Sequence, residues 1–261
     1  MRFQHTLLAL ASAQSALAGL LRYPDSLSGH TSNTIDRRAA SNITTNYAVE
    51  AKKAIAGLTA QGADFLKSKN IKQGDNPRSN GPQGIWLGND GQYKLKVTNY
   101  KNEPMVLVMW HGNAWLNDNK PIITQSLGPI EEAIISVNGN APGIAFSAVY
   151  AGTKANGLIE NTWGELTTSQ WSTINVSRLP NMNGDGLTLV SPTGCRAHMS
   201  SCVFMCRNGA TKCGDPKSYD LYNCKFPGAG TGEDPFTHDP SGGCNLGSGG
   251  DISAIFSVKP N

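Results

Sequence analysis

The segment that decides the fold runs from Thr162 to Cys206 and reads TWGELTTSQWSTINVSRLPNMNGDGLTLVSPTGCRAHMSSCVFMC. It contains three short stretches with strand character, which predict strands at residues 163–166, 172–177 and 187–190. It joins an upstream region without cysteine to a tail that holds every cysteine of the chain. We therefore expect it to connect a sheet-forming body with a disulfide-rich lobe.

The region before this segment is predicted to form one strand after another. Tyr93, Leu95 and Val97 alternate with polar residues, as in a half-buried strand, and the apolar run MVLVMW at residues 105–110 suits a fully buried one. Further strands are predicted at residues 133–137, 144–150 and 252–258. Short strands separated by turns about every ten residues are typical of a β-sandwich or barrel. The last strand, beyond the cysteine-rich tail, is expected to re-enter the body and fix the lobe at both ends.

The N-terminus has the features of a secretory precursor. Residues 1–18 combine a charged start, a short apolar stretch and an Ala-Leu-Ala exit, which predicts a signal peptide. Residues 19–38 form a possible propeptide that ends in the dibasic pair Arg37-Arg38. The apolar stretch is too short for a membrane span, which needs about 20 apolar residues.

Residues 39–84 are predicted to be a helical arm and a linker. Apolar residues recur at helical spacing over residues 45–68, which predicts an amphipathic helix that either packs against the body or forms a mobile arm. Residues 69–84 are rich in Gly, Pro, Asn and Ser and have the composition of a linker. The main domain is therefore expected at residues 85–261, with its disulfide-rich lobe at residues 195–250.

The cysteine pattern favours disulfide bonds. An even number of cysteines in a secreted chain predicts three disulfides, with 15 possible connectivities. The alternative, a zinc site, is disfavoured because no Cys-x-x-Cys pair occurs. We expect no metal or cofactor. The six residues are Cys195, Cys202, Cys206, Cys213, Cys224 and Cys244.

Charge and sequons limit the classes of partner. The chain has 22 basic and 19 acidic residues, scattered without a basic stripe, so nothing favours nucleic acid or an anionic membrane. The sequons at Asn42 and Asn175 are possible glycan sites. We expect a monomer in the extracellular space or the cell wall.

The order of these segments resembles the thaumatin-like family, in which a β-sandwich is followed by a disulfide-rich lobe and a closing strand. The resemblance covers roughly residues 90–260 and is closest to fungal secreted effector- and allergen-like proteins. The motifs that carry it lie at residues 97–99 and 105–110, 162–166, 174–177, 184–187, 191–195 and 254–260.

The chain departs from that family at one cysteine pair. The family usually bonds a cysteine of the opening strand region to one in the closing strand. Here the matching places hold Lys101 or Asn102, and Ser257. Both halves are missing together, as expected if the fold stayed and the bond was lost.

The resemblance implies an acidic cleft between the sandwich and the lobe, linked to β-glucan binding and in some members to weak glucan hydrolysis. Glu165 matches the cleft glutamate, and Asp185 is the nearest candidate for a cleft aspartate. Either residue also suits a plainer role, Glu165 on an exposed strand face and Asp185 in a turn. Trp115 and Trp171 are the aromatic candidates for stacking on sugar rings.

Hydrolysis requires two carboxyl groups about 5 to 10 Å apart, one of them with a raised pKa. Where the signature strand usually shows Asp, this chain has Asn175, which cannot act as an acid or base. We therefore expect a secreted protein that binds a cell-wall polysaccharide such as β-glucan. The alternatives are a weak glycoside hydrolase that uses Glu165 and Asp185, and an effector whose surface binds a host extracellular protein.

Overall fold

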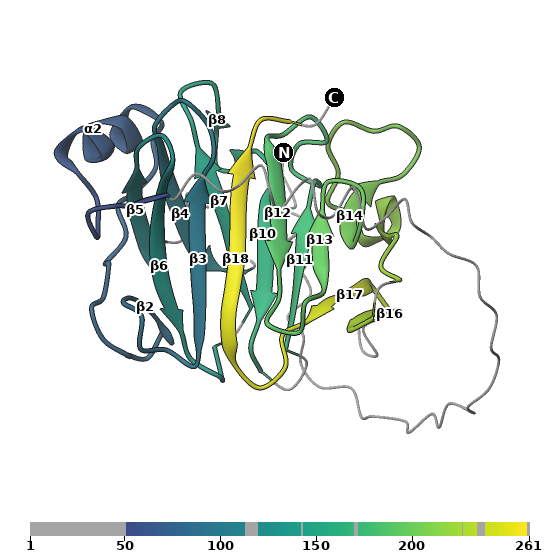
Figure 1. The fold of residues 1–261 in the computed structure, drawn as a ribbon. Coiled ribbons are helices and arrows are strands. Elements are labelled where there is room, and N and C mark those ends of the chain that lie inside the picture. The colour runs from purple at the N-terminus through teal and green to yellow at the C-terminus, as the bar shows by residue number, and fades with distance from the viewer. Residues whose placement is uncertain are drawn as a thin grey trace, which may run out of the picture.

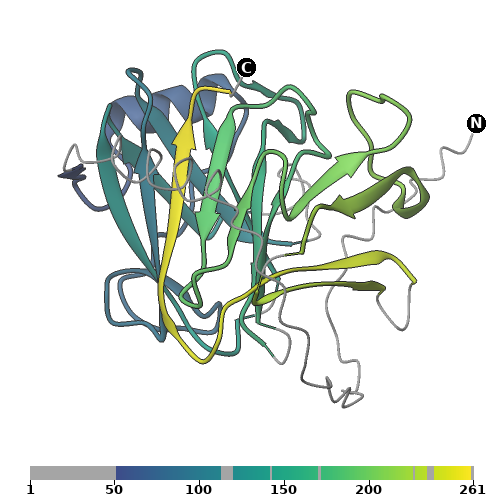
Figure 2. The same ribbon diagram turned by 45° about the vertical axis from the view of Figure 1, so that its right-hand side comes forward.

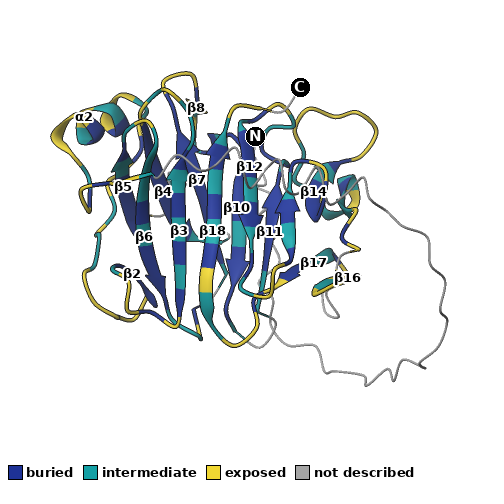
Figure 3. Cartoon of the chain, viewed as in Figure 1, coloured by how far each residue is buried: buried dark blue, intermediate teal, exposed yellow. Residues whose placement is uncertain are grey.

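The computed structural model describes residues 51–112, 120–141, 143–169, 172–225, 227–233 and 238–259. Within these residues the protein is mainly β, with two large sheets that face each other across a shared core (Figure 1). The predicted mainly β class with a cysteine-rich C-terminal region is therefore confirmed. Figure 3 shows the exposed residues gathered in the loops and on one side of the helix.

The front sheet in Figure 1 has the order β1-β6-β3-β18-β12-β13, and β2 also pairs with β6. The bounds are β1 Lys52–Lys53, β2 Ile85–Leu87, β3 Tyr93–Asn99, β6 Glu131–Val137, β12 Gly186–Val190, β13 Arg196–His198 and β18 Gly250–Ser257. Strand β18 runs parallel to β3 and antiparallel to β12. The C-terminal strand therefore re-enters the body as predicted.

The second sheet has the order β15-β14-β11-β10-β7-β4-β5, while β17 pairs with β11 and β16 with β17. The bounds are β4 Met105–His111, β5 Ile123–Leu127, β7 Ile144–Val149, β10 Trp163–Thr167, β11 Thr173–Ser177, β14 Val203–Cys206, β15 Tyr219–Tyr222, β16 Ala229–Glu233 and β17 Pro240–Asn245. The cysteine-rich tail thus contributes two hairpins to this sheet. Both hairpins project on the same side of the molecule, to the right in Figure 2.

The core forms because each sheet turns alternate side chains toward the other. In β3 the buried residues Tyr93, Leu95 and Val97 alternate with half-buried polar ones, as the sequence pattern predicted. Phe146 of β7 and Phe256 of β18 meet edge to face in the core, with ring centroids 6.3 Å apart.

The predicted helix is shorter than expected. Helix α2 spans Ala60–Ser68, and the side chain of Thr59 caps it by accepting a hydrogen bond from Gly62 N–H at 3.1 Å. Upstream, Lys52–Lys53 form β1 instead, and Gly57 has a φ of +111°, which a right-handed helix does not contain. The predicted helix over residues 45–68 is therefore wrong for residues 51–59, and residues 45–50 lie outside the described part of the chain.

Helix α2 packs on the outer face of the second sheet. Leu66 is fully buried in a cluster with Val106, Val108 and Trp110 of β4. Downstream, Asn76 is tied to the start of β5, because its N–H donates to Ile122 C=O at 2.9 Å and its Oδ1 accepts from Thr124 N–H at 2.8 Å. The helix therefore packs against the body and is not the mobile arm that the sequence offered as the alternative.

The remaining short elements are β8 Lys154–Ala155, β9 Ile159–Glu160 and the 3-10 helix η1 Pro216–Ser218. In the described part of the chain, no helix has the length and apolar character that a membrane crossing requires.

Gly164 sets the spacing between β10 and the core. It lies opposite Phe146, and a Cβ at this position would lie 2.1 Å from Phe146 Cζ. We expect Gly164→Ala to lower the free energy of unfolding by about 1–3 kcal/mol, since the ring must move within a packed core. Gly152→Ala is the control, because no atom lies within 4 Å of its added Cβ. Equal unfolding midpoints in urea for the two variants would contradict this packing.

Candidate ligand-binding groove

A pair of glycines lets β17 lie close against β11. Gly242 and Gly243 have φ values of +130° and +147°. A Cβ on Gly243 would lie 2.6 Å from Ile174 C=O, and one on Gly242 would lie 2.2 Å from Gly230 C=O. Only glycine suits such positions. The hairpin of β16 and β17 is therefore fixed to the sheet beside the hairpin of β14 and β15.

A groove of about 640 Å³ lies between the two hairpins. Its walls come from η1 and β15 on one side and from β16 and the start of β17 on the other. The lining residues are Arg207, Asp215, Pro216, Lys217, Asp220, Leu221, Thr231, Gly232, Glu233, His238, Asp239 and Pro240. This size is in the usual range for sites that bind small ligands or part of a longer one.

Both signs of charge line the groove. Arg207 and Asp220 form a two-pronged ion pair, with contacts of 2.6 Å from Nε to Oδ2 and 2.5 Å from Nη2 to Oδ1. Asp239 is buried within the wall. Burial raises the pKa of the Tyr219 phenol, and the charges of Asp239, Glu165 and Asp215 raise it further. These three carboxyl groups therefore lie within electrostatic reach of one buried phenol.

Glu165 and two neighbours place buried polar atoms on the outer face of the second sheet. Glu165 of β10 lies directly opposite Asn175 of β11, and Ser177 follows on the same face. Glu165 Oε1, Asn175 Oδ1 and Ser177 Oγ are buried and form no hydrogen bond of good geometry among the described residues. The Ser177 hydroxyl is nonetheless close enough to Glu165 to act on its pKa in the lowering direction.

Burial raises the pKa of Glu165 to about 7. The Glu165 side chain still reaches solvent in part, although its Oε1 does not. A carboxyl group with such a pKa holds its proton near neutral pH more readily than an exposed one, so it can donate as well as accept a hydrogen bond.

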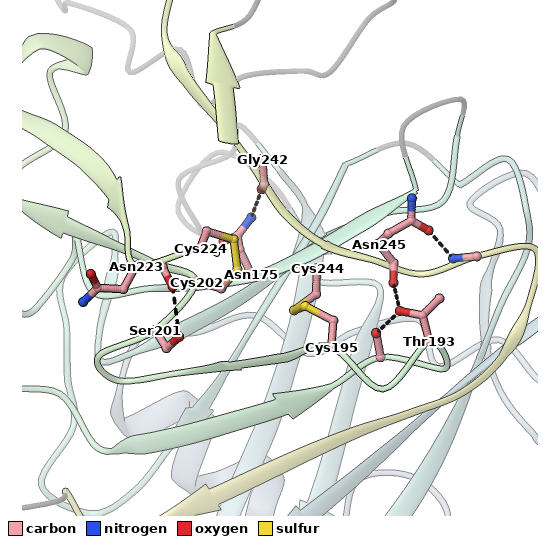
Figure 4. Close-up of a disulfide and its surroundings, with 12 residues drawn as sticks. Asn175, Thr193, Cys195, Ser201, Cys202, Asn223, Cys224, Gly242, Cys244 and Asn245 are labelled. Carbon is pink, nitrogen blue, oxygen red and sulfur yellow. Dashed lines mark hydrogen bonds between the residues drawn. A yellow bond between two sulfur atoms is a disulfide. The ribbon is translucent and has the colours of Figure 1, made fainter. Parts of the chain in front are cut away.

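Gly242 connects this polar group to the groove. Asn175 Nδ2 donates to Gly242 C=O at 3.4 Å (Figure 4). A Cβ on Gly242 would lie 2.9 Å from Leu221 Cδ2 in the groove wall. Asn175 therefore lies behind the groove wall, with Glu165 beside it on the neighbouring strand, and neither residue lines the groove. The sheet face and the lobe meet here.

The position of Asn175 argues against the predicted glycan at this residue. Asn175 is 8 % exposed, and its Nδ2, the atom that would carry a sugar, faces Gly242. An N-linked glycan needs a surface position, so it does not fit this packing. The other predicted glycan residue, Asn42, lies outside the described residues.

Asp185 lies in a different environment from Glu165. Its Oδ1 contacts Lys101 Nζ at 2.7 Å, and its Oδ2 accepts from Asn161 Nδ2 at 3.0 Å. Lys101 also pairs with Glu103 at 2.7 Å and lies over the ring of Tyr150. This network joins the end of β3 to the turn before β12.

Asn161, which contacts Asp185, precedes Glu165 by four residues in the chain. That Glu165 and Asp185 act as a carboxyl pair stays a prediction, as does a binding role for Asp185. Asp215 and Asp239 are the further acids that the structure places near Tyr219.

The aromatic candidates Trp115 and Trp171 lie outside the described residues, as do the predicted signal peptide and propeptide. The sequence pattern did not identify Asp215, Tyr219 or Asp239 as candidates. These three residues lie in the cysteine-rich tail, whose composition shows no strand pattern. The signal that could have identified them was their place in the disulfide-rich lobe that the family resemblance implies.

The cysteines form three disulfides, Cys195–Cys244, Cys202–Cys224 and Cys206–Cys213. All six cysteines are bonded, as predicted. Among the described residues, Cys195, Cys202 and Cys244 have the proximity of a metal-ligand set. Because their sulfurs are in disulfides, they offer no thiolate to zinc.

Comparison of the sequence with models of protein families and with curated proteins gives no match.

Proposed function

We propose that this chain is a secreted protein that binds a cell-wall polysaccharide, such as β-glucan, in the groove between the two lobe hairpins. The observation that carries this proposal is the groove itself, which lies between two hairpins and whose lining combines charged side chains of both signs with Leu221 and Thr231.

Sugar hydroxyls suit this groove because each both donates and accepts a hydrogen bond. The groove lining offers charged groups that bind hydroxyls, including Glu233 and the paired Arg207 and Asp220. A neutral polyhydroxyl chain is therefore the ligand class that the groove chemistry favours.

The pairing of β18 with β3 supports a thaumatin-like fold, and the disulfides support an extracellular location. The parallel register of β18 on β3 sets Phe256 opposite Asn99, and Tyr100 N–H donates to Phe256 C=O at 2.7 Å. Lys101 follows Tyr100 and Ser257 follows Phe256, so the two residues come directly after a hydrogen-bonded pair. These are the places where the thaumatin-like family usually has the bonded cysteine pair that this chain lacks. The three disulfides are typical of an oxidising compartment and agree with the signal peptide predicted at residues 1–18.

Blocking the groove tests the proposal. Gly232 lines the groove, and its added Cβ would meet no atom closer than 3.8 Å, so Gly232→Trp is expected to fold and to fill the groove. We expect it to weaken retention on insoluble β-1,3-glucan at least about tenfold, the loss of roughly 1.4 kcal/mol of binding free energy. The measurement is a depletion isotherm on washed glucan particles.

Gly152→Trp is the matched control, since Gly152 is exposed, has open space around it and lies outside the groove. It is expected to bind as the unchanged protein does. Equal retention of both tryptophan variants would contradict the groove as the site. No retention of the unchanged protein on any wall polysaccharide would favour the alternative of a host extracellular protein.

The hydrolase alternative has one observation in its favour, the raised pKa of Glu165 near neutrality, which suits a general acid. Under the binding proposal, Glu165→Gln keeps adsorption to glucan and no reducing sugar is released by either protein. Release of reducing sugar by the unchanged protein, abolished in Glu165→Gln with adsorption kept, would establish hydrolysis instead.

A further inference from the structure

Two of the disulfides lie against each other in the lobe. The Sγ atoms of Cys195, Cys202 and Cys244 all lie within 4.8 Å of one another, although Cys202 is bonded to Cys224 and not to either of the other two (Figure 4). All three residues are at most 2 % exposed. Cys195 and Cys244 therefore each have two sulfurs of this group within reach, of which one is the bonded partner. Cys202 has two sulfurs of the group within reach and is bonded to neither of them.

The backbone around the Cys202–Cys224 bond is held in an uncommon conformation. Cys202 has a φ of +46°, and Asn223, next to Cys224, has a φ of +52°. Positive φ is sparsely populated by residues other than glycine, and such a conformation is strained. The packing around these residues, including Ser201 Oγ donating to Asn223 C=O at 3.0 Å, holds the chain in place.

We propose that Cys195, Cys202 and Cys244 form a thiol–disulfide exchange centre in which Cys202 is the attacking group. Two equivalents of a thiol of the glutathione class reduce the Cys202–Cys224 bond: the first forms a mixed disulfide with one cysteine and releases the other as a thiol, and the second resolves it, so that the two thiols leave as their own disulfide and the two cysteines gain two electrons and two protons. The Cys202 thiolate then attacks the Sγ of Cys195 or Cys244. A new disulfide forms, the Cys195–Cys244 bond breaks, and the displaced sulfur leaves as a thiolate that takes up a proton.

The exchange changes what anchors the groove wall. Cys244 lies in β17, opposite Ile174 of β11, and its bond to Cys195 ties that hairpin to the loop before β13. If Cys202 pairs with Cys195, Cys244 is freed and the hairpin of β16 and β17 loses its covalent tie. The consequence of this loss for ligand binding in the groove rests on the proposed function, whereas the exchange chemistry does not.

The third disulfide provides an internal comparison. Cys206 and Cys213 are separated by only 7 positions and belong to a different hydrophobic cluster, with Leu179 and Tyr219. No third cysteine sulfur joins them in a close group among the described residues. A thiol released there has no neighbouring disulfide to attack.

Two single variants test the proposal on the full mature chain. Cys224→Ser leaves Cys202 as a free thiol beside an intact disulfide, and Cys213→Ser does the same for Cys206. Both are incubated at neutral and mildly alkaline pH, trapped with N-ethylmaleimide under acid quench, and mapped by peptide mass spectrometry. We expect Cys224→Ser to yield a mixture with Cys195–Cys202 or Cys202–Cys244 bonds, growing with pH because the thiolate is the nucleophile.

Cys213→Ser is expected to keep Cys195–Cys244 and Cys202–Cys224 with the label on Cys206 alone. If Cys224→Ser carries its label only on Cys202 and keeps Cys195–Cys244 at every time point, the proposal is wrong. Where Cys224→Ser fails to fold, the unchanged protein is treated with limiting glutathione. Exchange predicts label on Cys224 together with Cys195 or Cys244 after a single reduction, and label on Cys202 and Cys224 alone would overturn it.

Discussion

Between pH 4.5 and pH 7 the protein is expected to lose about 2 kcal/mol of folding stability because of Glu165 alone, and Glu165→Gln is expected to abolish that loss. Burial raises the pKa of Glu165 from 4.5 to about 7 in the folded state. In this window the unfolded chain releases the proton while the folded protein keeps it, so stability falls as pH rises. The shift of about 2.5 pKa units corresponds to about 3 kcal/mol, and the partly exposed side chain reduces this figure through solvent screening.

The measurement is the free energy of unfolding in urea for both proteins at a series of pH values. Near pH 4 the two are expected to be similar, and above pH 7 the glutamine variant is expected to be the more stable. Glu160→Gln is the control, because Glu160 is paired with Lys212 at the surface. A constant difference between Glu165→Gln and the unchanged protein from pH 4 to pH 8 would show that the pKa of Glu165 is the same in the folded and the unfolded state.

Loss of the Cys195–Cys244 bond is expected to destabilise the protein more than loss of Cys206–Cys213. The two bonds close loops with sequence separations of 49 and 7. In the chain-entropy model, loops of these lengths correspond to about 4 and about 2 kcal/mol of stability at 25 °C. The double variants Cys195→Ser/Cys244→Ser and Cys206→Ser/Cys213→Ser are compared by urea unfolding without reductant.

Loss of the Cys195–Cys244 bond is also expected to disturb the groove wall, because this bond anchors β17 and the Cys206–Cys213 bond does not. Glucan adsorption is therefore expected to weaken in the first double variant and to persist in the second under conditions where both remain folded. A ranking of stabilities in the opposite order would mean that strain or residual structure, and not loop length, decides the contribution of these bonds.

Much of the sandwich could be predicted because its strands carry simple patterns. Alternation over Tyr93, Leu95 and Val97 and the continuous apolar run of β4 each follow from how a strand presents its faces, and both strands formed. The return of the last strand also followed from its isolated apolar character beyond the lobe. Strand β5 was not predicted, since its buried residues include Thr124 and Gln125, whose polar groups are satisfied by distant partners such as Gly57 N–H.

The helix was over-extended because apolar spacing alone cannot show where a helix begins. The sequence contained Gly57 and the cap residue Thr59, but only the structure shows that Gly57 adopts a positive φ and that β1 pairs with β6. Tertiary pairing of Lys52–Lys53 with Glu131 and Glu132 replaced the local preference for helix.

The candidate site was predicted only in part, for a physical reason. Glu165 was identified, but its importance depends on burial and on the cross-strand neighbour Asn175, which come from pairing of β10 with β11. Asp215 and Asp239 come from the lobe, whose glycine-rich strands have no hydrophobic periodicity to reveal them. Their approach to Tyr219 depends on the disulfides and on the close packing that Gly242 and Gly243 permit.

The most direct test of the central claim is hydrogen–deuterium exchange of the mature protein with and without a soluble β-1,3-gluco-oligosaccharide. We expect slower exchange in the peptides of β15, β16 and β17, with the strand carrying Asn175 also protected, and little change in β3, β6 or β18. Saturating ligand that protects only the front sheet, or that binds without protecting either hairpin, would contradict the groove as the ligand site.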